Sequence, residues 1–330
     1  MSPSSSDSGR IARLHVAALV TAFLLGGATP ALAQDRTARW LDSRGFRDLL
    51  ALHLEDRLEA AAGDSDARRR AASRLAEVYA TLLRSEEDQA TRERLVNRSR
   101  RLLEIVPEEE SQALRVALAR NRYLNASRTL EDDRIELADP EAVTAAVSEL
   151  AALAEELDVI RRTMTRRIDT LSKSRSRRVE RRLQEALQWQ AMAALLEGWS
   201  RYYVGRATED DTELERAQTA FGVVLQGDSP IPSPTEVSID LQSVEGFARA
   251  MLGMGMTTAS LISVNVADQW FKRLELPETD AATRQALPGW RIAALIEAGD
   301  HREILEQLEL LDARAAREGD EALPVSWLRL

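Results

Sequence analysis

Residues 141–171 read EAVTAAVSELAALAEELDVIRRTMTRRIDTL, and this stretch decides the fold class. Its apolar side chains recur at steps of three and four residues: Val147, Leu150, Ala154, Leu157, Ile160, Met164, Ile168 and Leu171. Steps of that size place side chains on one face of an α-helix, because a helix turns once in about 3.6 residues. The stretch therefore predicts one long helix with a continuous apolar stripe.

The apolar pattern resumes in residues 177–206, after a polar gap at residues 172–176, at Val179, Leu183, Leu187, Leu195 and Tyr202. Two helices of near-equal length joined by a short polar segment predict an antiparallel hairpin over residues 141–206, about 45 Å long at about 1.5 Å per residue. The gap contains neither glycine nor proline. One continuous helix is therefore the alternative.

The rest of the chain after residue 40 follows the same helical period, with breaks at Gly, Pro or Asp. Hydrophobic residues make up 44% of the chain and aromatic residues only 5%, so the core consists mainly of Leu, Ala, Val and Ile. We predict an all-α fold, an α-solenoid of antiparallel helix pairs around the long hairpin. The other expected helices are 46–61, 65–84, 89–105, 109–138, 212–225, 244–257, 260–274, 290–298 and 302–317.

One segment resembles a linker between domains. Residues 228–236 read DSPIPSPTE, and three prolines in five residues favour an extended backbone and remove helix hydrogen bonds. We therefore expect an N-terminal helical array over residues 34–227 and a C-terminal array of helix pairs over residues 237–330.

Residues 1–33 have the pattern of a secretory signal peptide. Arg10 and Arg13 precede an apolar run at residues 14–25, and residues 31–33 read ALA. A positive start, a short apolar middle and a small-x-small end predict cleavage between Ala33 and Gln34. The alternative is an uncleaved anchor, but the run is shorter than the roughly 20 residues that cross a bilayer. We expect a periplasmic or secreted protein with no transmembrane span after cleavage.

Composition limits the possible functions. The formal net charge is −10, and it becomes −11 once the leader with Asp7, Arg10 and Arg13 is removed, which argues against nucleic acid as a partner. The chain has no cysteine and three histidines, and the sequence contains none of the common catalytic or phosphate-binding motifs. We therefore expect no enzymatic activity, no cofactor and no metal.

The C-terminal region resembles the tetratricopeptide repeat family. Gly255, Ala267 and Phe271 have the spacing of that family's first-helix glycine, second-helix alanine and second-helix aromatic residue. Ala217 and Phe221 repeat the alanine-to-aromatic step, so the resemblance is best over residues 190–318. The interval from Phe221 to Phe271 is 50 residues, however, where one period would be about 34. The resemblance implies a protein-interaction scaffold with a concave groove, but the matched positions are all packing positions.

Two groups of residues are candidates for contacting a partner. Between Arg161 and Arg182 there are ten basic residues against two acidic ones, and the predicted hairpin tip carries Arg175, Arg177 and Arg178. Arginine binds phosphate and carboxylate through two parallel hydrogen bonds, so the tip suits an anionic surface or an acidic protein face. A solvated helix surface is the alternative interpretation.

The second group is aromatic. Trp199, Tyr202 and Tyr203 have helical spacing, which suits either core packing or the wall of a groove that binds an extended peptide.

Together these features predict an exported, non-enzymatic scaffold of the cell envelope that binds a protein partner through a solenoid groove. The alternative function is structural: a coiled-coil-type component that self-associates through the 141–206 hairpin. A hydrolase would require a deep polar pocket with two buried acids.

Overall fold

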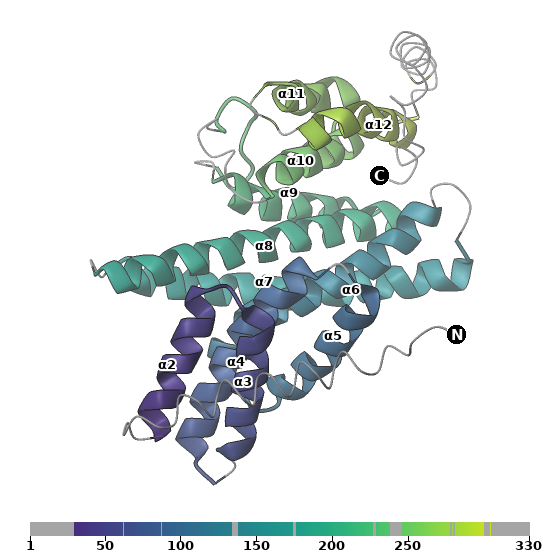
Figure 1. Ribbon diagram of the computed structural model, residues 1–330. Helices are drawn as coiled ribbons and strands as arrows, with labels where there is room; N and C mark the ends of the chain where they lie inside the picture. The colour runs from purple at the N-terminus through teal and green to yellow at the C-terminus, as the bar shows by residue number, and fades with distance from the viewer. Residues whose placement is uncertain are drawn as a thin grey trace. The chain divides into compact units, whose positions relative to one another are not determined.

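A computed structural model describes residues 30–299, with gaps at 62, 87, 134–137, 174–175, 227–228, 238–245, 278 and 280, together with residue 304. Every regular element in these residues is helical, and successive helices pack in consecutive pairs (Figure 1). The predicted all-α architecture of helix pairs is therefore confirmed. The chain forms two compact units, unit 1 up to Ser111 and unit 2 from Gln112 onwards.

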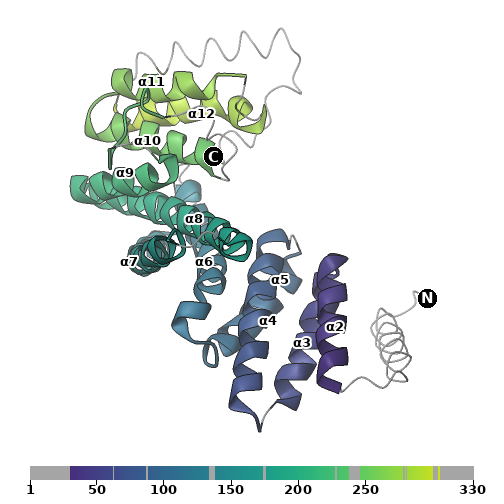
Figure 2. The same ribbon diagram turned by 90° about the vertical axis from the view of Figure 1, so that its left-hand side faces the viewer.

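Unit 1 consists of α2 (Pro30–Ser43), α3 (Arg47–Ala60), α4 (Ser65–Ser85), α5 (Gln89–Leu103) and the short 3₁₀ helix η1 (Glu108–Glu110). Each α-helix packs against the next one along the chain (Figure 2). The helix starts are capped by carboxylates: Asp64 accepts hydrogen bonds from the backbone N–H groups of Asp66 and Ala67, and Asp88 accepts one from Thr91. Leu50, Leu54, Leu75 and Tyr79 form part of the buried core.

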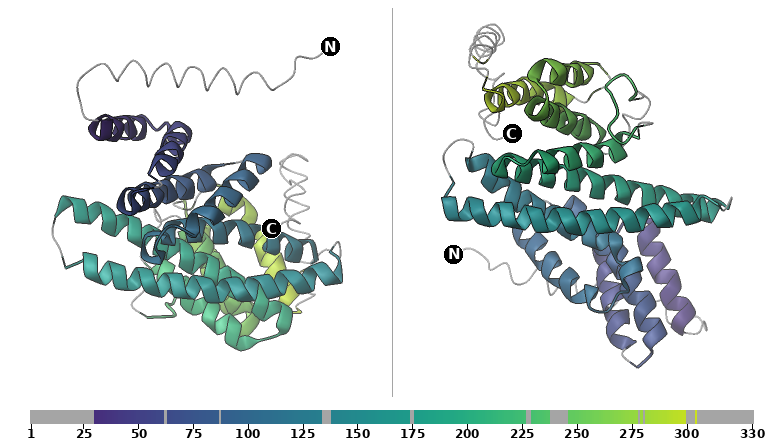
Figure 3. Two further views of the ribbon diagram at one scale, coloured as in Figure 1. Left: turned by 90° about the horizontal axis from the view of Figure 1, so that it is seen from below. Right: turned by 180° about the vertical axis from the view of Figure 1, so that it is seen from behind.

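Unit 2 is built on the long hairpin. Helices α7 (Pro140–Leu171) and α8 (Arg177–Thr208) have 32 residues each and lie side by side, as Figure 3 shows. The hairpin predicted for residues 141–206 is confirmed, and the continuous-helix alternative is wrong. Leu150, Leu153 and Leu157 of α7 are fully buried, and α6 (Gln112–Asp133) also packs on both long helices.

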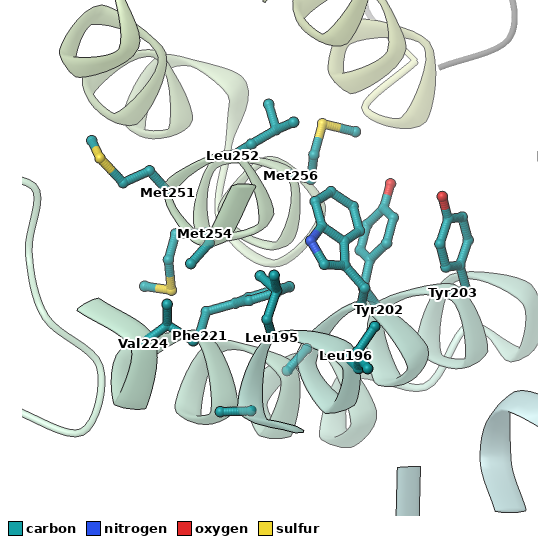
Figure 4. Close-up of a cluster of buried hydrophobic side chains, with 14 of the residues drawn as sticks. Leu195, Leu196, Tyr202, Tyr203, Phe221, Val224, Met251, Leu252, Met254 and Met256 are labelled. Atoms are coloured by element: carbon teal, nitrogen blue, oxygen red, sulfur yellow. The ribbon is translucent and has the colours of Figure 1, made fainter. Parts of the chain in front are cut away.

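The remaining helices of unit 2 continue from α8 in layers (Figure 1): α9 (Asp211–Leu225), α10 (Phe247–Leu261), α11 (Val264–Leu274) and α12 (Ala281–Glu297). The ring of Phe221 on α9 packs where both neighbouring helices carry glycine. A Cβ added to Gly198 of α8 would come within 2.5 Å of that ring, and one added to Gly253 of α10 within 2.3 Å. Figure 4 shows the Phe221 side chain beside those of Leu195 and Met254.

The next pair of helices is packed in the same manner. A Cβ added to Gly255 of α10 would come within 2.5 Å of the Phe271 ring on α11, and Ala267 is fully buried. These three residues carry the tetratricopeptide resemblance, and in the structure they are helix-packing residues.

The two compact units do not divide at residues 228–236, where the sequence predicts a linker between two arrays. Helices α9 and α10 flank this segment, yet they pack against each other within unit 2. The segment itself lies close to α9, because a Cβ on Gly222 would come within 2.0 Å of the carbonyl oxygen of Pro230. Proline prevents helix formation here but does not prevent the chain from packing. The boundary between units falls instead after Ser111, where no proline-rich run marks it.

Three predicted helix boundaries are wrong: the end of α10, the start of α11 and the start of α12. The break between α10 and α11 falls at Ile262 and Ser263, where the Ser263 hydroxyl accepts a hydrogen bond from Val266 N–H, rather than before residue 260. Helix α12 begins at Ala281 and runs through Pro288. Its buried residues Leu287, Trp290 and Ala294 lie on one face across the proline, so burying this stripe outweighs the local cost of proline.

At the N-terminal side, α2 was not predicted, and it includes the expected cleavage point between Ala33 and Gln34. Residues 1–29, which hold most of the predicted leader, lie outside the described residues, as does nearly all of the helix expected over residues 302–317. Export and the signal peptide remain predictions.

The contacts of Phe221 generate a test of this packing. Replacing glycine by alanine inside a helix normally stabilises it by about 1 kcal/mol, but in Gly198→Ala and Gly253→Ala the added methyl group overlaps the Phe221 ring. We expect each variant to lose about 1–3 kcal/mol of unfolding free energy, measured by urea denaturation of the full chain.

The control is Gly63→Ala, since a Cβ at Gly63 has no heavy atom within 4 Å. Adding Phe221→Leu to Gly253→Ala should recover part of the loss, because the smaller side chain leaves room for the methyl group. Equal or higher stability of both single variants would contradict the packing described.

Candidate functional site

A buried ionic network connects α7, α8 and α9 in unit 2. The Arg201 side chain on α8 is only 5% exposed and contacts three carboxylates. Its Nε donates to Glu197 at 3.1 Å, its Nη1 to Glu213 at 2.8 Å and its Nη2 to Glu155 at 3.1 Å. Arg201 therefore ties the three helices together through one guanidinium group.

The network continues along α7 through a second arginine. Arg161 donates from Nε to Glu197 at 2.7 Å and from Nη2 to Asp158 at 2.5 Å. Asp158 also pairs with Arg162 at 2.6 Å. Glu197 and Asp158 are both buried, so each buried carboxylate is bonded to two arginines and carries a compensated charge.

These contacts act on the pKa of Arg201. Burial alone would lower the pKa of the guanidinium group, but the hydrogen bond to Glu213 and the charge and hydrogen bond of Glu197 outweigh it, and the pKa is raised above its ordinary value. Arg201 therefore stays positively charged, which suits a structural anchor better than a proton-transfer group.

A hollow of about 620 Å³ lies beside this network. Five carboxylates line it: Glu155 of α7, Glu213 of α9, and Glu209, Asp210 and Asp211 at the turn between α8 and α9. Ala151 and Val204 supply an apolar part of the lining. We call this feature the acidic hollow, and its strong negative charge suits a cationic side chain.

The turn that builds the acidic hollow is well defined. Glu209 ends α8 in the left-handed conformation, with φ of 54°. Asp210 then caps α9 by accepting a hydrogen bond from Thr212 N–H at 2.9 Å. Glu155 and Glu213 are held by Arg201, so Glu209 and Asp211 are the carboxylates best placed to bind a partner.

The predicted aromatic group lies in the core. Trp199, Tyr202 and Tyr203 are only 2%, 0% and 4% exposed. The Trp199 ring packs against Phe221 at a centroid distance of 5.6 Å and against Trp290 at 5.5 Å. The groove-wall interpretation of these three residues is therefore replaced by core packing, because a peptide on the surface could not reach the rings. The Tyr203 hydroxyl also donates a hydrogen bond to Glu131.

The basic group is only partly described. Arg175 lies outside the described residues, and Arg177 and Arg178 begin α8, with side chains about which the structure says nothing. Of the other members, Arg161 points into the ionic network. Arg162 pairs at its edge. Of the ten basic residues between Arg161 and Arg182, at least two are therefore engaged in ion pairs.

Sequence reasoning missed the acidic hollow. The run Glu209-Asp210-Asp211-Thr212-Glu213 is visible in the sequence, but by itself it indicates only the start of the helix expected over residues 212–225. Glu155 is more than fifty positions away, so no local pattern connects it with that run. The two buried acids that a hydrolase would need are present as Asp158 and Glu197, but both are bonded to arginine and neither lines the acidic hollow.

Two further observations concern the residues that the structure describes. No group of three or more His, Cys, Asp or Glu residues among them is arranged to hold a metal ion. None of the helices described has both the length and the apolar character needed to cross a bilayer.

Comparison with known proteins gives no relative for this chain. No family model matches it, and neither the curated proteins nor the solved structures contain a match. The resemblance to tetratricopeptide repeats therefore remains a prediction.

The ionic network makes a prediction about stability. In Arg201→Met, the buried Glu197 keeps only Arg161, and Glu155 and Glu213 lose their shared partner. Removing one partner of a buried ion pair typically costs about 3–5 kcal/mol. We expect a loss in that range in the chemical denaturation of the full chain.

Arg216→Met is the matched control, because Arg216 is exposed and, among the residues that the structure describes, pairs only with Glu213. Such an exposed ion pair is worth about 0–1 kcal/mol. Adding Glu197→Gln to Arg201→Met should restore stability in part by removing the uncompensated charge. If Arg201→Met and Arg216→Met had equal effects, the network would not be a buried anchor.

Proposed function

We propose that this protein is an exported, non-enzymatic scaffold that binds a basic segment of a partner protein in the acidic hollow of unit 2. The observation that carries the proposal is the convergence of five carboxylates, from α7, from α9 and from the turn between α8 and α9, on one hollow of about 620 Å³. The hollow replaces the aromatic groove that the sequence suggested.

The chemistry of the hollow suits lysine or arginine side chains. Their aliphatic stems can lie on Ala151 and Val204 while the charged heads reach Glu209 and Asp211. Opposite charges across such an interface speed association and select the partner more than they add affinity. A partner held in this way should dissociate as salt concentration rises.

The support under the hollow also favours binding. Arg201 holds Glu155 and Glu213 on rigid helices, so these carboxylates lose little conformational freedom when a ligand binds. A preorganised surface of negative charge suits recognition of a cationic side chain.

Charge reversal at the hollow tests the proposal. The probe is a fluorescein-labelled nine-residue peptide of alternating Arg and Ala, and its affinity is measured by fluorescence anisotropy at low and moderate salt. We expect Glu209→Lys with Asp211→Lys to weaken binding at least tenfold, because the attraction becomes repulsion. The control is Asp169→Lys with Glu185→Lys, which reverses two exposed carboxylates elsewhere on the hairpin and should leave affinity within about twofold.

Equal loss in both variants would show diffuse attraction to an acidic protein and would contradict a site at the hollow. Failure of the native chain to bind the peptide at low salt would contradict it as well.

Self-association through the hairpin is a second candidate function. One end of α8 lies at the basic group of residues 161–182, and the other end leads into the acidic hollow. A tip from one copy could therefore bind the hollow of the next. Sedimentation velocity of the same variants tests this function. It is supported if the native chain forms larger species as its concentration rises and if the charge reversal at Glu209 and Asp211 abolishes them. A native chain that stays monomeric would exclude it.

A further inference from the structure

A second hollow, of about 330 Å³, lies within unit 1 and has the opposite charge. Four arginines line it: Arg39 of α2, Arg57 of α3, and Arg70 and Arg74 of α4. Asp42 is the one carboxylate in the lining. We call this feature the arginine hollow. Its positive lining is unexpected in a chain whose formal net charge is −10.

The three helices place these arginines by their spacing. Arg70 and Arg74 are four residues apart on one face of α4, and Arg39 and Asp42 are three apart on α2. Buried Leu54 and Ala71 form an apolar part of the lining between the helices. The packing of α2 on α3 and of α3 on α4 therefore brings arginines that are distant in the sequence into one hollow.

Ion pairing inside unit 1 does not neutralise this group. Arg74 is committed, since its guanidinium pairs with Asp42 and, at 2.5 Å, with Glu77. Arg57 and Arg70 have no hydrogen bond or ion pair from their side chains to any residue that the structure describes. Two guanidinium groups from different helices are therefore available to one ligand.

We propose that the arginine hollow binds a phosphate group of a phosphorylated ligand. A phosphate dianion matches the two available charges, and its oxygens can accept the paired hydrogen bonds that guanidinium groups donate. The apolar lining accommodates a small organic moiety attached to the phosphate. A soluble phosphate ester and the headgroup of an anionic lipid present the same group, so the chemistry is shared and experiment distinguishes the two sources.

Calorimetric titration of the full chain with glycerol 3-phosphate and with pyrophosphate tests the proposal. Co-sedimentation with phosphatidylglycerol vesicles tests whether the phosphate belongs to a lipid, and phosphatidylcholine vesicles serve as the comparison with no net charge. We expect Arg57→Gln with Arg70→Gln to weaken binding of the phosphate probe at least tenfold. Asp42→Asn should instead strengthen binding several-fold, because it removes the competing carboxylate and one of the ion pairs that hold Arg74. Because one variant should weaken binding and the other strengthen it, a general loss of folding cannot explain both results.

The matched control is Arg100→Gln with Arg101→Gln, which removes two exposed arginines of α5 outside the hollow. Unchanged affinity in this control supports the site, and a loss equal to that of Arg57→Gln with Arg70→Gln would overturn it. Absence of binding to every phosphate probe and to both kinds of vesicle would also overturn the proposal. Binding to vesicles alone would assign the phosphate to a lipid headgroup.

Discussion

The close contact between the Phe221 ring and two glycines determines how unit 2 is assembled. Gly198 and Gly253 lack the Cβ atoms that would overlap the ring, so α8 and α10 can both approach α9 closely. Gly255 repeats this arrangement with Phe271 between α10 and α11. A bulky ring packed against a bare backbone sets the distance between layers, because protein interiors are close-packed and tolerate little overlap. The layers beyond α8 depend on these contacts.

The same geometry places the charges. Arg201 follows Gly198 by three residues on α8, so the helix that packs on Phe221 also carries the central arginine of the ionic network. That network holds Glu155 and Glu213 at the acidic hollow. In unit 1, helix packing likewise gathers arginines from three helices. Both hollows are thus consequences of helix packing rather than of local motifs.

Much of the architecture could be predicted from the sequence, whereas the sites could not. The apolar stripe of α7 and the polar gap before Arg177 identify the hairpin because helix formation and its interruption are local properties. Trp199 is buried against α9 and α12, and Tyr203 packs against Tyr123 of α6, which the spacing of the aromatic residues alone does not reveal. At Pro288 the local rule fails in the opposite direction. Proline normally ends a helix, but α12 continues through it because the burial of its apolar face outweighs that cost. Glu155 and Glu213 come to line the same hollow only when the chain folds, and so do Arg57 and Arg70.

Hydrogen exchange of the full chain tests most directly whether these glycine contacts make unit 2 one cooperative stack. We expect the buried amides of α8, α9 and α10 to share the slowest opening step, and Gly253→Ala to accelerate exchange in all three helices together. Independent opening of α10 to α12, with α7 to α9 still protected at native levels in that variant, would contradict it. Residues 228–236 would then separate two domains after all.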